Sequence, residues 1–263
     1  MRTTRFTLLF FVYFLIGCQT TPTGRKQLIL RSEGEMANLG AQSFAAMKKK
    51  GNVSAEPKAN KAVTCITHRL LVAMDEKPSD WEVRVFEDKS PNAFALPGRK
   101  IGVHTGMLDL VENQDQLAAV IGHEIGHVLA HHGNERISQQ LAVTGGLAIT
   151  SLVLSNQKKN RQTNQLIVAG LGIGAQFGVL LPFSRTHETE ADELGVRYMA
   201  KAGFDPRQAA ALWRVMQKAS GGGAPPEFMS THPSNSTRIR RLSRLAPKFM
   251  DDFGSVKDRP SCF

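Results

Sequence analysis

Apolar positions in residues 116–132 recur with the period of an amphipathic helix, so this segment is predicted to be helical. Asn113 and Gln116 have the spacing of a capping box, and Gly133 follows the last periodic position. Both ends of this helix are therefore marked in the sequence.

Two further helices are predicted upstream. Ser32 and Glu35 form a capping pattern that opens the first, which stops at Gly51. The second covers residues 57–74, where Pro57 stands at a first position whose backbone N–H needs no partner within the helix.

The strand signals are fewer. Apart from Phe86, residues 81–87 alternate apolar and polar side chains, which is typical of a strand. Residues 92–96 and 100–104 flank a Pro97-Gly98 turn and are predicted to form a hairpin. The patterns together predict an α+β fold that is mostly helical.

Composition narrows the class of protein. The 263 residues are 41% hydrophobic and 21% charged, which describes one ordinary globular domain and excludes a disordered or fibrous chain. The formal net charge of +10 favours contact with an anionic surface. No nucleic-acid motif accompanies this charge, so we expect a membrane surface and no nucleic-acid partner.

The N-terminus has the pattern of an export signal. Arg2 and Arg5 precede an apolar run, residues 6–16, that is too short to span a bilayer. The run ends in Leu-Ile-Gly-Cys, which resembles a bacterial lipobox whose cysteine, here Cys18, is lipidated and becomes the mature N-terminus. Gln19 after this cysteine indicates the outer membrane, facing the periplasm; the alternative is an uncleaved anchor.

These signals divide the chain into four parts. We expect a lipoprotein signal peptide over residues 1–17, a lipid-anchored tether over 18–30, one main folded domain over 31–250 and a tail over 251–263.

The chemistry centres on His123-Glu124-Ile125-Gly126-His127. Two histidines four residues apart lie about 40° apart around a helix and one turn apart along it, so both can bind one zinc ion. Glu124 follows the first histidine, where its carboxylate can take a proton from a water that the metal activates. A buried helix with two core histidines is the alternative, and it leaves Glu124 without a role.

Neither His131 nor His132 is expected to complete the site. His131 lies on the stripe of His123 and His127, but along a straight helix its Cα is about 12 Å from that of His123. The third ligand must therefore come from another segment.

The best source is the segment 184–192, which opens a helix. Glu188 and Asp192 share one face of it, so one carboxylate can bind the metal while the other accepts the free ring proton of a ligating histidine. Glu190 competes with Glu188, because it lies about 200° around the helix and only one of the two can face the metal. A solvated acidic helix start is the alternative.

These residues resemble the CAAX-prenyl-protease-like zinc metallopeptidases, a gluzincin family, and within it the periplasmic lipoprotein members. The resemblance spans about residues 23–245. Besides the HExxH helix it rests on short motifs in four other places: residues 92–98, Thr105-Gly106, Ser184-Arg185 with Glu188-x-x-x-Asp192, and Thr231-His232-Pro233 with Arg238.

The resemblance implies a minimal zincin fold with a small mixed sheet and one zinc ion per chain. It implies that His123, His127 and Glu188 hold this ion, and that Asp192 supports a ligating histidine. Because this favours Glu188 over Glu190, Glu190→Ala is expected to bind zinc nearly normally.

Two further roles follow from the resemblance. Thermolysin-like enzymes align their substrate on an edge strand that begins with a run similar to Asn92, Ala93 and Phe94, although this strand could also merely pack on the helix. In some periplasmic relatives a histidine at the place of His232 acts as an extra ligand that displaces the catalytic water. His232 could instead stabilise the oxyanion, or pack beneath Arg238.

The two remaining cysteines predict a disulfide. Cys65 and Cys262 are left after Cys18, and the periplasm is oxidising, so a disulfide between them is expected.

Residues 141–155 and 166–183 are apolar and contain glycines, and we expect a buried or interfacial helical pair that covers the site rather than a membrane span.

The sequence thus predicts a zinc endopeptidase, anchored to the outer membrane, that degrades misfolded or unassembled envelope proteins. Its partners would be these substrates, the membrane and the outer-membrane assembly machinery. The competing hypothesis is a chaperone or assembly factor for outer-membrane proteins whose zinc site is mostly latent.

Overall fold

The computed structural model describes residues 18–50, 52–154, 183–221, 226–232 and 236–263. The expected signal peptide, residues 1–17, and nearly all of the second apolar segment lie outside the described residues. Helices and strands follow one another along the chain in this order: β1 Cys18–Thr20, β2 Lys26–Leu28, α2 Glu33–Lys50, α3 Pro57–Ala73, the 3-10 helix η1 Pro78–Asp80, β3 Glu82–Phe86, β4 Ala93–Leu96, β5 Lys100–His104, α4 Thr105–Leu110, α5 Gln114–Leu129, α6 His132–Leu154, α8 Arg185–Lys201, α9 Gln208–Ala219, α10 Glu227–Thr231, α11 Ser236–Leu245, the 3-10 helix η2 Ala246–Phe249 and α12 Met250–Ser255.

The main sheet is small and mixed. Its strand order is β3-β5-β4, with β3 parallel to β5 and β4 antiparallel to it. The predicted hairpin is confirmed, since Phe94 pairs with Gly102 and Leu96 with Lys100. Strand β4 is at the edge of the sheet, and its far side faces helix α5.

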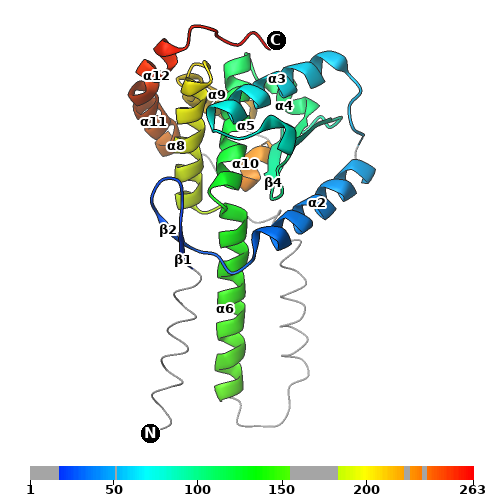
Figure 1. The fold of residues 1–263 in the computed structure, drawn as a ribbon, viewed down its shortest axis with the longest axis vertical. Coiled ribbons are helices and arrows are strands. Elements are labelled where there is room, and N and C mark those ends of the chain that lie inside the picture. The colour runs from blue at the N-terminus through cyan, green and yellow to red at the C-terminus, as the bar shows by residue number, and fades with distance from the viewer. Residues whose placement is uncertain (1–17, 51, 155–182, 222–225, 233–235) are drawn as a thin grey trace.

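Helix α5 forms the centre of the body, with α3 on one side and α8 on the other (Figure 1). Its fully buried side chains include Leu117, Ile121 and Ile125, which pack in one core with Ile66 of α3 and Ile101 of β5. An apolar helix buried on nearly all sides gains stability from each of these side chains, about 1.5–3 kcal/mol for each Leu or Ile. The mostly helical fold with a small mixed sheet is therefore confirmed.

Local signals set the helix starts as expected. Ser32 Oγ accepts from Glu35 N–H at 3.2 Å while Glu35 Oε2 accepts from Ser32 N–H at 2.9 Å, a reciprocal capping box. Asn113 Oδ1 accepts from Gln116 N–H at 2.9 Å and caps α5. The end of α5 differs from the prediction: the helix stops at Leu129, because His131 has a φ of 54°, and α6 begins at His132.

Residues 18–30, expected as a lipid-anchored tether, lie against the body of the domain. Strands β1 and β2 pair antiparallel, with Cys18 opposite Leu28, and Thr21 and Gln27 are buried. The segment packs beside α6 and α8 because its polar side chains bind buried carboxylates there, as described below (Figure 1).

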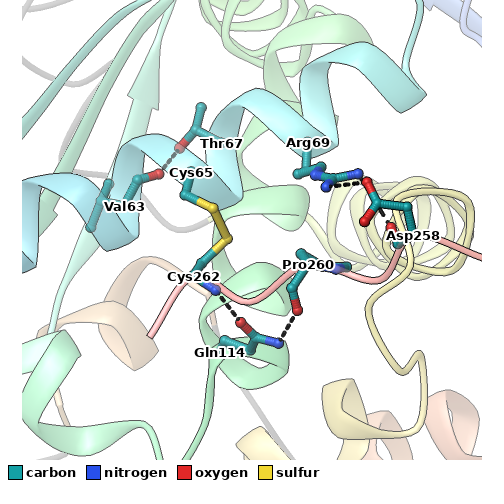
Figure 2. The surroundings of a disulfide bond; sticks show 8 residues. All are labelled: Val63, Cys65, Thr67, Arg69, Gln114, Asp258, Pro260 and Cys262. Carbon is teal, nitrogen blue, oxygen red and sulfur yellow. Dashed lines mark hydrogen bonds and ion pairs between the residues drawn. A yellow bond between two sulfur atoms is a disulfide. The ribbon is translucent and has the colours of Figure 1, made fainter.

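The C-terminal tail is also attached to the domain. Cys262 and Cys65 of α3 form a disulfide, the pair suggested by the sequence (Figure 2). Gln114, at the start of α5, holds the same segment by accepting from Cys262 N–H and donating to Pro260 O, both at 2.8 Å.

Helix α6 contains most of the first apolar segment and extends away from the body (Figure 1). Within the part of the chain that the structure describes, none of the helices combines the length and the apolar character needed to cross a membrane.

Candidate metal centre

Helices α5 and α8 cross with their backbones in contact. A Cβ at Gly195 of α8 would lie 3.0 Å from the backbone nitrogen of His123, and one at Gly126 of α5 would lie 3.1 Å from the carbonyl oxygen of Ala191. Only glycine allows so close an approach. The crossing places the first turns of α8 beside the HExxH residues of α5.

Four buried side chains meet at this crossing. His123, His127, Glu188 and His232 each offer a ligand atom, and all four atoms lie within 4.8 Å of one another. The Nε2 atoms of His123 and His127 are 3.0 Å apart, and Glu188 Oε1 is 3.3 Å from His127 Nε2. His232 Nδ1 is 3.1 Å from His123 Nε2.

The structure separates Glu188 from Glu190. Both oxygens of Glu188 face the paired histidines, at 3.3 Å and 3.5 Å from their Nε2 atoms. Glu190 points elsewhere, to Arg25 and His132. Of the two candidates that the spacing left open, Glu188 is therefore the one in the metal group.

Asp192 contacts the ring nitrogen of His123 that does not face the other ligand groups. Its Oδ1 lies 3.0 Å from His123 Nδ1, and Arg238 donates to it at 2.7 Å. The Arg238 guanidinium lies 3.8 Å from the ring centre of Trp213, which fixes its plane. This arrangement leaves the Nε2 of His123 directed at the metal group, as the sequence suggested for Asp192.

Glu124 is buried beside the four ligand groups. Its Oε2 accepts from Ala95 N–H of β4 at 3.1 Å. Its Oε1 lies 3.2 Å from His232 Nε2, yet no described residue donates a hydrogen bond to this oxygen. Burial raises the pKa of the Glu124 carboxyl, which suits a group that takes and returns a proton.

The surroundings of His123 and His127 shift their pKa values in opposite directions. Burial alone would lower the pKa of His123, but the Glu188 and Asp192 carboxylates outweigh it and raise that pKa to about 9. Burial dominates at His127 and holds its pKa well below the usual value. Glu188, despite its burial, has a pKa well below its usual value because of the imidazoles around it.

These residues fit one zinc ion. Two imidazoles and one carboxylate are the donor set of a catalytic zinc site, in which a further position stays open. The Oε1 of buried Glu124, which accepts no hydrogen bond from the residues that the structure describes, lies beside that set, where a metal-bound water would need an acceptor.

The expected substrate strand lies next to this centre. Ala95 N–H points away from β5 towards Glu124, and because successive residues of a strand alternate, Ala93 presents its backbone on the same side. Phe94 instead packs its ring over Gly102, and Asn92 O accepts from His104 N–H at 2.9 Å. A cavity of about 720 Å³ adjoins the site, with Ala95, His127 and Phe183 among its described lining residues.

Sequence reasoning missed Arg25 near the centre and assigned no supporting role to His132 or Glu190. His132 contacts His127, Glu190 contacts His132, and Arg25 contacts Glu190. The only signal in the sequence was an unexplained second glutamate in the first turns of α8.

Two histidines and a carboxylate from two crossing helices, with a buried glutamate beside them, define the site of a zinc metallopeptidase. The family model described as Peptidase family M48 matches residues 57–246. The chain belongs to this family.

Curated relatives are similar over most of this chain. The Mitochondrial metalloendopeptidase OMA1 of Schizosaccharomyces pombe is 40% identical over 189 residues, which cover 71% of this chain and 52% of the relative. The Metalloendopeptidase OMA1, mitochondrial, of Bos taurus is 30% identical over 273 residues, which cover 98% of this chain and 50% of the relative. The Beta-barrel assembly-enhancing protease of Escherichia coli is 24% identical over 241 residues, which cover 87% of this chain and 48% of the relative.

The chain spans about half the length of the curated relatives it matches. None of these three relatives is named as a CAAX prenyl protease, so the resemblance is confirmed at the level of family M48.

Proposed function

We propose that this chain is a zinc-dependent endopeptidase of envelope quality control, which degrades misfolded or unassembled proteins. The observation that carries the proposal is Glu124, a buried carboxylate whose one oxygen accepts from the edge strand and whose other oxygen, beside the metal group, accepts no hydrogen bond within the described part of the chain. One side chain thus joins the peptide-aligning strand to the hydrolytic centre.

When bound, zinc supplies Lewis-acid polarisation of the scissile carbonyl and lowers the pKa of a water. Glu124 takes the proton of the attacking water and delivers it to the leaving amine. Asp192 keeps His123 in the orientation that binds metal. The outward backbone groups of Ala93 and the outward carbonyl of Ala95, whose N–H donates to Glu124, hold the substrate as an added strand.

The substrate class follows from this edge. A peptide can pair with β4 only when it is extended and its own backbone groups are free, as in an unfolded or unassembled chain. The name of the E. coli relative, a β-barrel assembly-enhancing protease, supports the same setting.

A matched pair of substrates tests the activity. One polypeptide is offered in its folded form and, after removal of its disulfides, in an unfolded form. We expect zinc-loaded enzyme to cleave the unfolded form alone, chelation to abolish cleavage, and added zinc to restore it. If zinc-loaded enzyme cleaves neither form but speeds the folding of an outer-membrane barrel, the chaperone or assembly-factor hypothesis holds instead.

Anchoring is a separate part of the proposal. Cys18 would carry the lipid that holds the chain on the outer membrane, facing the periplasm, and the net charge of +10 would support contact with anionic headgroups. Cys18→Ala should release the protein from the membrane fraction or block its processing. Unchanged fractionation would show that lipid at Cys18 is not the anchor.

A latent site is favoured by one specific observation. His232 is the fourth buried member of the metal group, with Nδ1 2.8 Å from Glu188 Oε1 and Nε2 3.2 Å from Glu124 Oε1. As an extra ligand it would occupy the position of the water that Glu124 activates. We therefore infer that His232 restrains basal proteolysis.

A further inference from the structure

The hairpin formed by β1 and β2 reaches into the body close to the metal centre. Between its strands, Arg25 donates to Glu190 Oε2 through Nε at 2.9 Å, and to both oxygens of Glu135 at 2.8 Å and 2.6 Å. Thr23 donates to the other oxygen of Glu190. The side chains of Glu135 and Glu190 are 5% and 4% exposed, so the Arg25 guanidinium pairs with two buried carboxylates at once.

Glu190 is connected to the ligand histidine His127 through the ring of His132. Its Oε2 lies 3.1 Å from Nε2 of His132, which is fully buried, and Nδ1 of His132 lies 2.9 Å from Nδ1 of His127. His187 stacks on the His132 ring with 4.5 Å between ring centres and keeps it in plane. The contacts run without a gap from Arg25 to His127.

The chemistry of these groups sets the direction of each hydrogen bond. Arg25 can only donate and the Glu190 carboxylate can only accept, so Nε2 of His132 carries the proton that faces Glu190. Nδ1 of a neutral His132 is then an acceptor, and the proton between the two rings belongs to Nδ1 of His127. This tautomer leaves the lone pair of His127 on Nε2, the atom that lies 3.0 Å from His123 Nε2.

The two ligand histidines are therefore supported from the same helix in different ways. Asp192 of α8 reaches His123 directly at 3.0 Å. Glu190, also of α8, reaches His127 through the ring of His132. Carboxylate support of this kind orients a ligating imidazole and raises its basicity.

We propose that Arg25, Glu190 and His132 are positioning residues for His127, which makes the N-terminal hairpin a part of the metal centre. Residues 21–25 then tune zinc affinity from outside the HExxH and α8 segments. The proposal replaces the expectation from sequence that Glu190→Ala binds zinc nearly normally.

Zinc affinity is the direct test, measured on the mature chain by competition with a chromophoric chelator, without any peptide substrate. We expect Glu190→Ala and His132→Phe to raise the zinc dissociation constant by about 10–100-fold, as loss of such support does at other metal sites. Arg25→Ala should weaken binding in the same direction, and Arg25→Lys, which keeps one donor for Glu190, should restore part of the loss. The readout is independent of the proposed proteolysis, so failure of one does not imply failure of the other.

A stability control and a double mutant complete the experiment. Phe253→Ala truncates a buried side chain on α12, outside the core that packs around α5, so it should lower the melting temperature and leave zinc affinity unchanged. If the contacts act as one chain, Glu190→Ala should cost little further affinity in a His132→Phe background. Unchanged zinc affinity in the folded single variants, or full additivity in the double variant, would overturn the proposal. If the alanine variants do not fold, Arg25→Lys and Glu190→Gln decide between the same outcomes.

Discussion

Glu124 has two carboxylate oxygens in different surroundings, one held by the backbone of β4 and the other without a hydrogen-bond donor among the described residues. Glu124→Gln keeps an acceptor for Ala95 N–H but removes the base. We expect zinc content and melting temperature to stay as in wild type while kcat falls by about 10²–10⁴-fold, the usual contribution of a positioned general base. Peptide hydrolysis and metal analysis on the same sample check this, and cleavage at the normal rate would contradict the mechanism.

The change in proteolysis caused by His232→Ala distinguishes the three roles considered for His232. Because its imidazole lies within the metal group, we expect His232→Ala to raise basal proteolysis, since the position for the attacking water is no longer contested. The measurement is cleavage of an unfolded substrate at equal zinc content. A fall in activity would favour oxyanion stabilisation, and no change would favour packing beneath Arg238.

At the scale of elements, the contact between α5 and α8 decides whether the ligands meet. Gly195→Ala adds a Cβ only 3.0 Å from the backbone of His123 and 3.2 Å from that of Gly122. Backbone atoms cannot move aside as a flexible side chain can, so we expect a loss of about 1–3 kcal/mol of stability and weaker zinc binding. Thermal unfolding and chelator competition check both effects.

Gly34→Ala is the matched control for this prediction. A Cβ at Gly34 of α2 meets nothing within 4 Å, so the same change should stabilise the helix, by at most about 1 kcal/mol, and leave zinc affinity unchanged. If both variants behave alike, the crossing does not depend on glycine.

At the scale of the whole molecule, the disulfide joins residues 197 positions apart and fixes the C-terminal segment against α3 and the start of α5 (Figure 2). Cys262→Ser should cost about 2–5 kcal/mol of stability, because the unfolded chain regains the freedom that the crosslink removes. Urea unfolding checks this. Reduced wild type should match the variant, and equal stability of oxidised wild type and variant would contradict the prediction.

Acid stability depends on the cluster that joins the hairpin to α6. Burial alone would raise the pKa of Glu135, but hydrogen bonds from His187 and Arg25 lower it from 4.5 to about 2. A depressed carboxyl pKa gives stability that is fully present above the unfolded value of 4.5 and is lost as the pH falls towards 2.

Glu135→Gln should therefore lower stability at neutral pH, and its difference from wild type should shrink between about pH 5 and 2, by at most about 1.4 kcal/mol per pH unit. Urea unfolding at each pH measures the difference. Glu193→Gln, an exposed change on α8, should follow wild type throughout. A constant difference between wild type and Glu135→Gln across this range would contradict the assignment.

The local features of this protein were determined by the sequence. Capping side chains set the starts of α2 and α5, the Pro97-Gly98 turn set the hairpin, and the four-residue spacing of His123 and His127 placed both imidazoles on one face. Each depends on residues within a few positions of one another, where helix and turn geometry allow few alternatives.

Only the tertiary structure decided which distant groups meet. Spacing left Glu188 and Glu190 as competitors because both lie in the first turns of α8, and the contact of α8 with α5 turned Glu188 to the histidines and Glu190 to Arg25, which is 165 positions away. The same packing made residues 18–30 part of the body and gave His132 a role. Such contacts depend on the burial and pairing of side chains from segments far apart in the chain, and sequence periodicity carries no information about them.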